Sequence, residues 1–445
     1  MSKVINAFPG YEFIRFGEDG KRHNMYRGTD LGFGGYIISN PGIYRNIALL
    51  DVVSLHPHSI IAMNCFGEYT QHFKELLDAR VAIKNGDFEK ARTMLGGKLA
   101  PFLKDESQAG DLAQALKIAI NSVYGLTSAG FDNPFRDSRN MNNIVALRGA
   151  LFMRTLQDEV ESRGYKIVAI KTDSIKIADA DKAIIDFCME FAQKYSYKFE
   201  FESYYDRICQ INDADYVAKY KSPEYCEEHF GFVPKDNKKN VKDWTVTGKQ
   251  FAIPYVFKTL FSKKPIEFED MCETFQVKSA LYLDMNEHLP DVKDYEKELD
   301  KAESKYKKGK LSDLSFHEIC DDLVPKIKEG HYYQFVGKVG QFTPVKEGCG
   351  GGVLLRSQND KYYAAAGSTG YRWLESENAK DLDPSVIDIS FYKTLVDNMV
   401  DEMGKYGDVE WFLTGDECGE TKAPVPEFMN IPEDCDDEVP WKLED

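Results

Sequence analysis

The sequence lacks the features of disulfide-bonded, zinc-binding and membrane-inserted proteins. Its nine cysteines are odd in number and scattered singly, with no C-x-x-C pair and no histidines at zinc-ligand spacing. No apolar run approaches the ~20 residues that span a bilayer, and no Lys/Arg-flanked apolar segment follows Met1. These absences predict reduced, mostly buried thiols in a soluble cytoplasmic protein that has no membrane partner.

Positive charge is also in deficit, with 56 Lys and Arg against 73 Asp and Glu and a formal net charge of −17. Taken alone, this excess argues against a nucleic-acid partner, because phosphate binding normally leaves a basic footprint. Much of the acidity lies in the tail from about residue 415 onward, whereas residues 216–264 are rich in lysine. A locally basic surface therefore stays open as an interpretation, beside that of an ordinary solvated face.

What the chain does contain is enough apolar material for large folded units. At 445 residues, with 43% hydrophobic and 13% aromatic content, it predicts an ordered protein of two or three units. The run from Ile47 to Leu50 ends in Asp51 and predicts a strand. Pro57 is expected to interrupt regular structure soon afterwards.

Helical periodicity dominates the next segment. Residues 70–125 have a helical pattern with Gly-containing breaks, which indicates an antiparallel helical insertion. A longer helix is predicted around Ile144 to Leu151, with Gly164 as its stop signal.

The period then changes to that of strands. Residues 166–170 and 175–178 flank a tight turn and predict a β-hairpin. A helix is predicted next, and then a strand over residues 197–203. Without the helical insertion the order is β-α-β-β-α-β, the split βαβ arrangement of ferredoxin-like domains. The first strand lies beside the central hairpin in that topology, so Asp51 and Asp173 are expected to meet at one edge of the sheet.

Two converging carboxylates suit a magnesium site, because Mg²⁺ takes one or two carboxylates together with phosphate and water oxygens. Arg80 and Lys84 are four residues apart in one predicted helix, and Lys117 and Asn121 have the same spacing in another. Each pair therefore projects from one helix face. If these two helix faces lie opposite two bound Mg²⁺ ions, they would hold a triphosphate for in-line phosphoryl transfer. The plain alternatives are a turn-capping aspartate and ordinary surface charge.

Three segments resemble, in order, the motifs of family B DNA polymerases. Residues 51–61, DVVSLHPHSII, are similar to the A motif. Residues 117–125, KIAINSVYG, fit the B motif K-x-x-x-N-S-x-Y-G, and residues 171–174, KTDS, fit the T-D-S half of the C motif. The resemblance covers about residues 40–205, and the amino-acid sequence around residues 34–58 is most like that of bacteriophage polymerases. It implies an α+β, right-hand-shaped polymerase with a ferredoxin-like βαββαβ palm, short helical fingers and a thumb-like C-terminal region.

This resemblance divides the chain into consecutive parts. They are a palm part with the A motif (1–69), fingers ending in the B motif (70–125), the palm with the C-motif hairpin (126–215), a DNA-contacting and thumb-like region (216–415) and an acidic tail (416–445).

The resemblance also implies a role for each matching residue. Asp51 and Asp173 would be the catalytic ligands of two Mg²⁺ ions, for which Mn²⁺ can substitute, with the Val52 carbonyl assisting. Thr172 in the hairpin turn and Lys219, in a segment weakly similar to the family's primer-gripping segment, would contact DNA. The implied nucleotide-binding residues are Ser54, Leu55, His56, Arg80, Lys84, Lys117, Asn121 and Tyr124.

Three departures from the family pattern bear on activity. His56 replaces the Tyr that excludes a 2′-hydroxyl, so we expect weaker but real discrimination against ribonucleotides. Lys171 replaces the first Asp of the C motif, but the essential second one is retained as Asp173, so activity is expected to survive. Residues 1–51 are too short for a 3′-5′ exonuclease domain, so proofreading is expected to be absent or supplied by another chain.

The sequence thus predicts a template-directed DNA polymerase that adds deoxynucleotides to a primer 3′ end. Its expected partners are primer–template DNA, deoxynucleoside triphosphates and a separate exonuclease or processivity subunit, in the host-cell cytoplasm if the source is viral. A catalytically weak or inactive DNA-binding relative is the first alternative, which Lys171, His56 and the low basicity favour. A cyclase-like or reverse-transcriptase-like palm, which does not need the K-x-x-x-N-S-x-Y-G helix, and a purely structural protein are the others.

Overall fold

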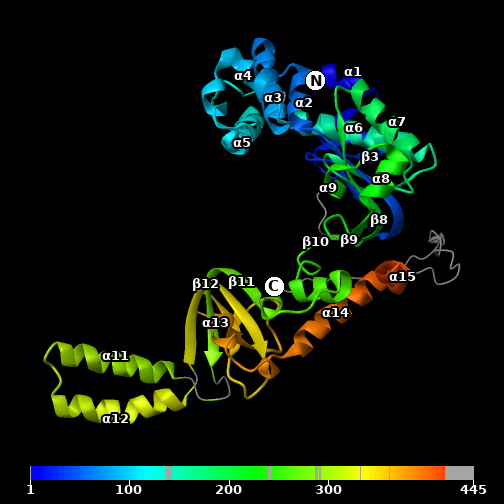
Figure 1. Cartoon of the computed structure of the whole chain (residues 1–445). Helices are drawn as coiled ribbons and strands as arrows, with labels where there is room; N and C mark the ends of the chain where they lie inside the picture. The colour runs from blue at the N-terminus through cyan, green and yellow to red at the C-terminus, as the bar shows by residue number, and fades with distance from the viewer. Residues whose placement is uncertain are drawn as a thin grey trace.

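The chain is a mixed α/β protein built on antiparallel sheets. Figure 1 shows its parts along a C-shaped arc, with a group of helices at one end and a projecting helical hairpin at the other. The computed structural model describes residues 2–136, 143–238, 243–285, 289, 292–330, 332–359 and 361–415. The acidic tail predicted at 416–445 lies outside these residues.

The first of two large sheets, called here the large sheet, has seven strands in the order β10-β9-β8-β5-β7-β6-β4, and each neighbouring pair is antiparallel. Its strands are β4 (Ile37–Ser39), β5 (Gly42–Val52), β6 (Lys166–Lys171), β7 (Ser174–Ala178), β8 (Phe199–Gln210), β9 (Tyr216–Tyr220) and β10 (Trp244–Thr247). The inner order β8-β5-β7-β6 is that of a βαββαβ unit. The predicted first strand and hairpin are thereby confirmed.

Three strands of this sheet were not predicted. β4 extends it beyond the hairpin, and β9 and β10 extend it beyond β8. Residues 216–247, assigned from the sequence to the C-terminal region, therefore add two strands to the same sheet as the hairpin.

Helices α6 (Ile144–Glu161) and α7 (Lys182–Lys194) pack on one face of the large sheet. Their core contains Leu50 and Val52 of β5, whereas Ile47 and Leu49 lie in a separate core on the other face. Because successive strand side chains alternate between faces, Asp51 lies on the face opposite α6 and α7. Strand alternation thus keeps the carboxylate out of the helix-covered core.

The predicted helical insertion is present as α3 (Thr70–Lys84), α4 (Phe88–Thr93) and α5 (Ala109–Thr127), which share a small core of their own. The expectation for Pro57 was wrong, because α2 (Leu55–Met63) begins before it. Proline is tolerated in the first turn of a helix, where its missing N–H has no intrahelical partner to lose.

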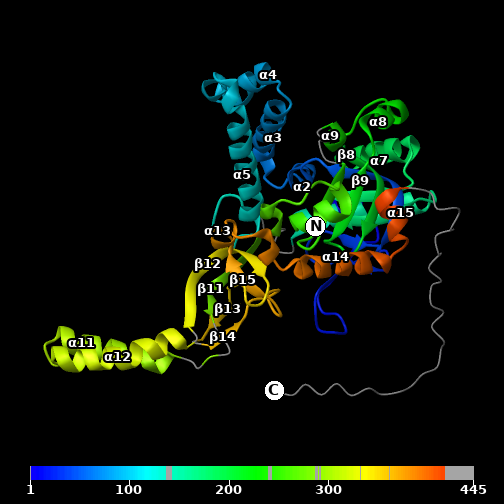
Figure 2. The same ribbon diagram turned by 60° about the horizontal axis from the view of Figure 1, so that its bottom comes forward.

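The C-terminal sheet has five strands in the order β14-β13-β11-β12-β15. They are β11 (Glu273–Met285), β12 (Tyr332–Val345), β13 (Val353–Gln358), β14 (Lys361–Ala364) and β15 (Arg372–Glu375). A Glu- and Lys-rich region forms the antiparallel pair α11 (Lys293–Lys307) and α12 (Asp313–Glu329) between β11 and β12. Figure 2 shows this pair projecting away from the rest of the molecule.

Helix α14 (Ile389–Gly404) joins the two sheets. Phe391 and Tyr392 near its start belong to the core of the C-terminal sheet, and Met399 and Met403 near its end pack in a core with Trp244 of the large sheet. The short helix α15 (Val409–Thr414) follows it, and Figure 2 shows both running beside the large sheet. Helix α14 therefore packs against both halves of the arc.

The remaining elements are short. An N-terminal helix α1 (Ser2–Ala7) precedes a small sheet of β1 (Glu12–Ile14), β2 (His23–Tyr26) and β3 (Thr29–Asp30). The short helices are α8 (Pro223–Phe230), α9 (Lys235–Lys238), α10 (Pro254–Phe257) and α13 (Ser376–Ala379). Among the helices of the described residues, none combines the length and the hydropathy needed to cross a bilayer.

The close approach of α6 to α2 gives a test of the packing. A Cβ added at Gly149 of α6 would lie 2.7 Å from Cδ2 of Leu55, which is buried at the start of α2. We therefore expect Gly149→Ala to lower the free energy of unfolding by about 1–3 kcal/mol through overpacking. Urea unfolding followed by circular dichroism measures this loss. Gly110→Ala in α5, where an added Cβ meets nothing within 4 Å, should cause no loss, and equal effects at both sites would contradict the packing.

Candidate functional site

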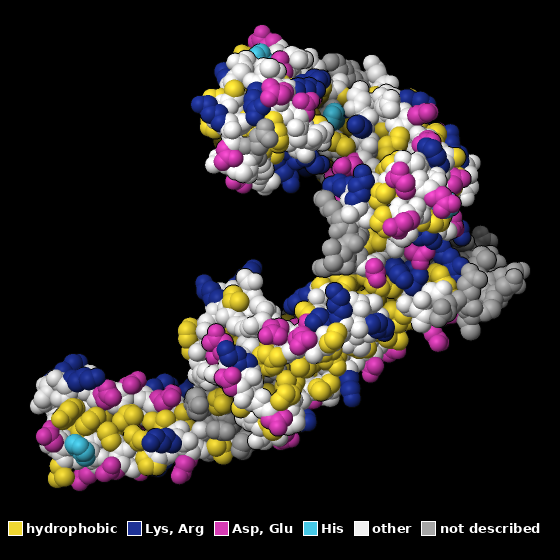
Figure 3. All heavy atoms as spheres, viewed as in Figure 1, with side chains coloured by type: hydrophobic (Ala, Val, Ile, Leu, Met, Phe, Trp, Pro, Cys, Tyr) yellow, Lys and Arg dark blue, Asp and Glu magenta, His cyan; other side chains and the backbone are white. Residues whose placement is uncertain are grey.

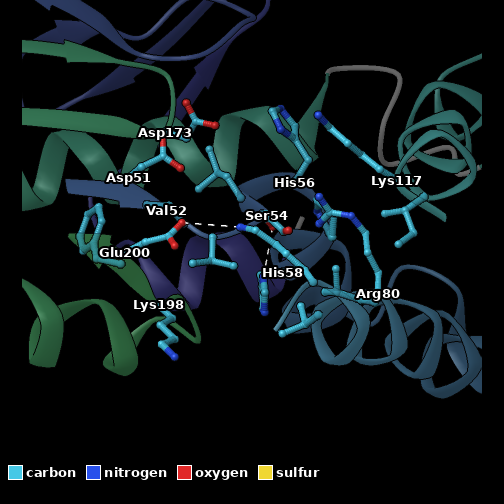
Figure 4. A pocket seen from close by; sticks show the side chains of 18 of the residues that line it. Asp51, Val52, Ser54, His56, His58, Arg80, Lys117, Asp173, Lys198 and Glu200 are labelled. Atoms are coloured by element: carbon cyan, nitrogen blue, oxygen red, sulfur yellow. Dashed lines mark hydrogen bonds and ion pairs between the residues drawn. The ribbon is translucent and has the colours of Figure 1, made fainter. Parts of the chain in front are cut away.

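A pocket of about 790 Å³ opens where α2, α3 and α5 meet the ends of β5 and β8 (Figure 4). Most of the site residues predicted from the sequence line it together. They are Asp51, Val52, Ser54, Leu55, His56, Arg80, Lys84, Lys117, Asn121, Tyr124 and Asp173. Segments far apart in the sequence therefore meet in one cavity, whereas the predicted DNA contacts Thr172 and Lys219 are not in its lining.

Asp51 and Asp173 reach the pocket from neighbouring strands. Asp51 is opposite Ser174 in the antiparallel register of β5 and β7, and the backbone N–H of Val52 donates to the Asp173 carbonyl at 2.7 Å. Figure 4 shows the two carboxylates side by side at one end of the pocket. The juxtaposition expected from the βαββαβ order is present.

The loops that carry these residues have unusual backbone conformations. Thr172, before Asp173, has φ of +60°, and Ser54, after β5, has φ of +53°. The Thr172 N–H donates to the Tyr36 carbonyl at 2.9 Å, which ties the turn to the segment before β4. Non-glycine residues in this region cost of order 1–3 kcal/mol and cluster at functional sites, where the surrounding structure holds them.

Further carboxylates surround Asp51. Glu200 of β8 is directly opposite Asp51 in register, and Glu202, two residues along, lies on the same face. Burial, and then the charges of Asp173, Glu202 and Glu200, raise the pKa of Asp51 from 3.8 to about 7. Burial also raises the pKa of Asp173. Among the described residues neither aspartate forms a salt bridge, so their negative charge is not neutralised by a direct ion pair.

This donor set fits magnesium. Hard carboxylate oxygens with unneutralised charge are the ligands that Mg²⁺ prefers, and it commonly takes only one or two of them from the protein. Within the described ranges, no group of three or more His, Cys, Asp or Glu side chains is arranged to hold a metal alone. Any ion here would complete its shell with water and with oxygens of a bound ligand.

Cationic side chains from α3 and α5 line the pocket across from the aspartates. Figure 4 shows Arg80 and Lys117 on the side away from Asp51 and Asp173. The Nε of Arg80 is buried and has no hydrogen-bond partner among the described residues. An unsatisfied buried donor costs about 1–3 kcal/mol, more when charged, so an anionic ligand beside Arg80 would be stabilised.

His56 lies between the two sides of the pocket. Its ring centroid is 4.5 Å from that of Tyr124, at a tilt of 50°. The Tyr124 hydroxyl donates to Asn143 Oδ1 at 2.9 Å, and Asn143 Nδ2 donates to the Phe33 carbonyl at 2.5 Å, which holds the tyrosine ring in place. Burial lowers the pKa of His56, against the opposing effect of Asp173, so the imidazole is neutral at neutral pH.

The two predicted DNA contacts have different positions. Thr172 lies in the β6–β7 turn next to Asp173. Lys219 lies on β9, which β8 separates from β5, and its ammonium is 5.8 Å from the Trp244 ring centroid. Thr172 is thus a neighbour of the pocket, whereas Lys219 lies two strands away from β5.

Sequence reasoning missed a charged group on the β8 side of the pocket. Glu200 and Glu202 of β8 both pair with Lys235 of α9, at 3.6 Å, and Glu200 also pairs with Lys84 of α3 at 3.8 Å. Lys198 lines the same wall. A signal was present in YKFEFES, where charged residues alternate with buried Phe199 and Phe201. No such sequence signal pointed to Lys235, which lies in a short helix remote in sequence.

No model of a known protein family matches the chain, and no curated protein matches it. Among solved structures, it is similar to the family B DNA polymerase from the hyperthermophilic archaeon Pyrobaculum calidifontis, with 10% identity and a TM-score of 0.37 over 86% of this chain and 46% of that chain. The chain spans less than half of that polymerase, and a likeness at this TM-score carries no argument about activity.

The raised pKa of Asp51 gives a pH-dependent test. An acid whose pKa rises on folding binds its proton more tightly in the folded state than in the unfolded state. The contribution of Asp51 to the free energy of unfolding is therefore most favourable below pH ~4 and is lost as the pH rises toward about 7. Asp51→Asn cannot ionise and should therefore stabilise the metal-free protein at pH 8. We expect a gain of about 1–2 kcal/mol after allowance for solvent screening, falling to near zero at pH ~4.

Thermal unfolding in a chelating buffer across this pH range measures the difference. Asp213→Asn, the same chemical change at an exposed loop position, is the control and should follow the wild-type profile. A gain at Asp51 that does not depend on pH would rule out the proposed electrostatic cause.

Proposed function

We propose that the chain is a template-directed DNA polymerase of the family B type, which extends a primer with deoxynucleoside triphosphates. One observation carries the proposal: residues of the segments that resemble the A, B and C motifs line a single pocket, with carboxylates on one side and cations on the other. Two-metal phosphoryl transfer requires this combination of ligands for cations and a cradle for phosphates.

In this proposal each side of the pocket has its own task. Asp51 and Asp173 would hold two Mg²⁺ ions, which when bound would supply the positive charge that the transferring phosphoryl group and the primer hydroxyl require. Lys117 and Arg80 would bind the triphosphate, and the Nε of Arg80, which no described residue satisfies, favours an anion there. The Tyr124 ring, fixed through its hydroxyl, would pack beside the nascent base pair without selecting a base.

The Lys84–Glu200 pair indicates how nucleotide binding could be coupled to the helices. Lys84 is 3.8 Å from Glu200 and both side chains are partly exposed, so the pair is weak. An incoming triphosphate, with more charge, would compete with Glu200 for the Lys84 ammonium. Lys235 would remain to balance Glu200 and Glu202.

The larger architecture fits the same interpretation. The large sheet with α6 and α7 would be the palm, α3 to α5 the fingers, and the C-terminal sheet a thumb-like part across the arc. Figure 3 shows the hollow of the arc and Lys and Arg side chains at several points around its rim. Such local positive charge would allow primer–template DNA to bind despite the net charge of −17.

A DNA-binding relative without catalysis is the second candidate. Lys171, which ends β6, puts a cation at the turn that carries Asp173, at the position where the family has a further aspartate. The two candidates share the DNA-binding hollow and differ only in whether the carboxylate pair supports phosphoryl transfer.

Removal of either carboxylate separates these candidates. Asp51→Ala or Asp173→Ala should reduce primer extension by roughly 10³-fold or more, because the metal-binding pair acts as a unit. Extension of a labelled primer–template in Mg²⁺ measures this, and affinity for the same DNA should change little. Asp213→Ala on an exposed loop is the matched control. Wild-type protein without extension activity would favour the inactive relative, and full activity in either variant would refute the assignment.

The His56–Tyr124 contact yields a test of sugar selection. His56→Tyr would add bulk beside Tyr124 and should increase the preference for deoxy- over ribonucleotides by about 10- to 100-fold. His56→Ala should move the preference in the opposite direction. Single-nucleotide incorporation with both sugars measures the ratio of kcat/KM values. Equal ratios in all three proteins would show that residue 56 does not contact the sugar.

A further inference from the structure

The C-terminal sheet carries aromatic side chains on the face turned away from its core. Leu281 and Leu283 of β11 are buried in the core face. Tyr282 lies between them in sequence and directly opposite Phe335 of β12 in register. Because directly opposed residues of an antiparallel pair share a face, Tyr282 and Phe335 both lie on the solvent side. Phe335 is 66% exposed, a large value for a phenylalanine within a strand.

These rings form a continuous surface across strands β11, β12 and β14. The Tyr282 ring contacts Phe335 edge to face at 5.5 Å and Tyr362 edge to face at 5.0 Å. Tyr333 stacks on Tyr362, with centroids 4.2 Å apart and ring planes 6° from parallel. Neighbouring rings fix one another, and the Phe335 ring at the end of the row is left with most of its surface open to solvent.

The same region is basic within an acidic protein. The ammonium of Lys293 lies 4.6 Å from the Tyr333 centroid and 4.3 Å from that of Tyr362. Lys278 of β11 is exposed. The sequences of β12, β13 and β14 contain no acidic residue, and Asp284, one of the two acids of β11, is buried. This distribution contrasts with the net charge of −17 for the chain.

We propose that this face binds single-stranded DNA, with a base stacked on Phe335 and phosphates held by Lys278 and Lys293. Open aromatic rings flanked by cations are how proteins bind single strands without sequence preference, because every base has a flat face and every nucleotide a phosphate. The charge favours this occupant over an apolar protein partner, which would not need a surrounding set of lysines. The sheet lies across the arc from the pocket (Figure 1), so this surface is separate from the proposed active site and does not depend on its catalysis.

Binding of fluorescein-labelled oligothymidine of about 12 nucleotides to the full chain, followed by anisotropy in a chelating buffer, tests the proposal. Phe335→Ala should weaken binding roughly tenfold, and Phe335→Trp should preserve it. Lys278→Ala combined with Lys293→Ala should lower the slope of log affinity against log salt by roughly one to two. Phe16→Ala is the matched control, since Phe16 is 75% exposed, lies 5.6 Å from the Arg15 guanidinium and is far in sequence from the C-terminal sheet.

Equal affinity of wild type and Phe335→Ala would overturn the proposal. So would concentration-dependent self-association of the wild type that Phe335→Ala abolishes, because the ring would then contact a second copy of the chain. Primer extension, measured on the same preparations, reports separately on the pocket. Loss of oligothymidine binding with normal extension, or the reverse, therefore distinguishes failure of one surface from failure of the other.

Discussion

The structure of the pocket depends on the antiparallel register of β5 between β7 and β8. In that register Asp51 stands opposite Ser174 on one side and Glu200 on the other, and the turn that follows β6 brings Asp173 beside it. A slip of one residue would move Asp51 to the face covered by α6 and α7 and would expose Leu50, which is fully buried. Burial of the alternate side chains of β5 thus enforces the position of the carboxylate, and the helices that carry the cations are then attached at its end.

This register has an electrostatic cost that the chain offsets only in part. Like charges directly opposite each other destabilise a strand pair, and Asp51 faces Glu200 with Asp173 nearby. Lys235 balances Glu200 and Glu202, but no described residue forms a salt bridge with either aspartate. On the other side of the pocket, the buried Nε of Arg80 has no hydrogen-bond partner within the part of the chain that the structure describes. The opposed charges are complementary to a ligand that is itself both cationic and anionic, such as a metal-bound triphosphate.

The second half of the chain is held against the first by side-chain packing rather than by strand pairing within one sheet. α14 contributes to the core of the C-terminal sheet with one end and to a core beside the large sheet with the other. Arg207 of β8 strengthens the junction, since its Nε donates to the Phe412 carbonyl of α15 at 2.6 Å. α10 and Ile253 before it also pack in both cores, so the distance between the pocket and the aromatic face of the C-terminal sheet depends on α14 and α10 together. The arc in Figure 1 is the result.

The sequence by itself determined the elements whose signals are local. The strand over the apolar run from Ile47 to Leu50, the hairpin at 166–178 and the helices of 70–125 follow from local side-chain patterns. Their order is sufficient to predict that Asp51 and Asp173 meet. The spacing of Arg80 with Lys84 and of Lys117 with Asn121 likewise predicted the faces that line the pocket. Pro57 was misjudged because a proline is compatible with the first turn of a helix as well as with its end.

Only the tertiary structure decided which distant residues became neighbours. Lys235 pairs with Glu200 because α9 packs against β8, and no local pattern encodes that contact. β9 and β10 joined the large sheet, and Lys219 lies away from β5, because strand pairing depends on long-range register. The row of rings around Phe335 likewise exists only once β11, β12 and β14 are aligned. Periodicity is a property of a few consecutive residues, whereas register and packing are set by free energy summed over contacts between remote parts of the chain.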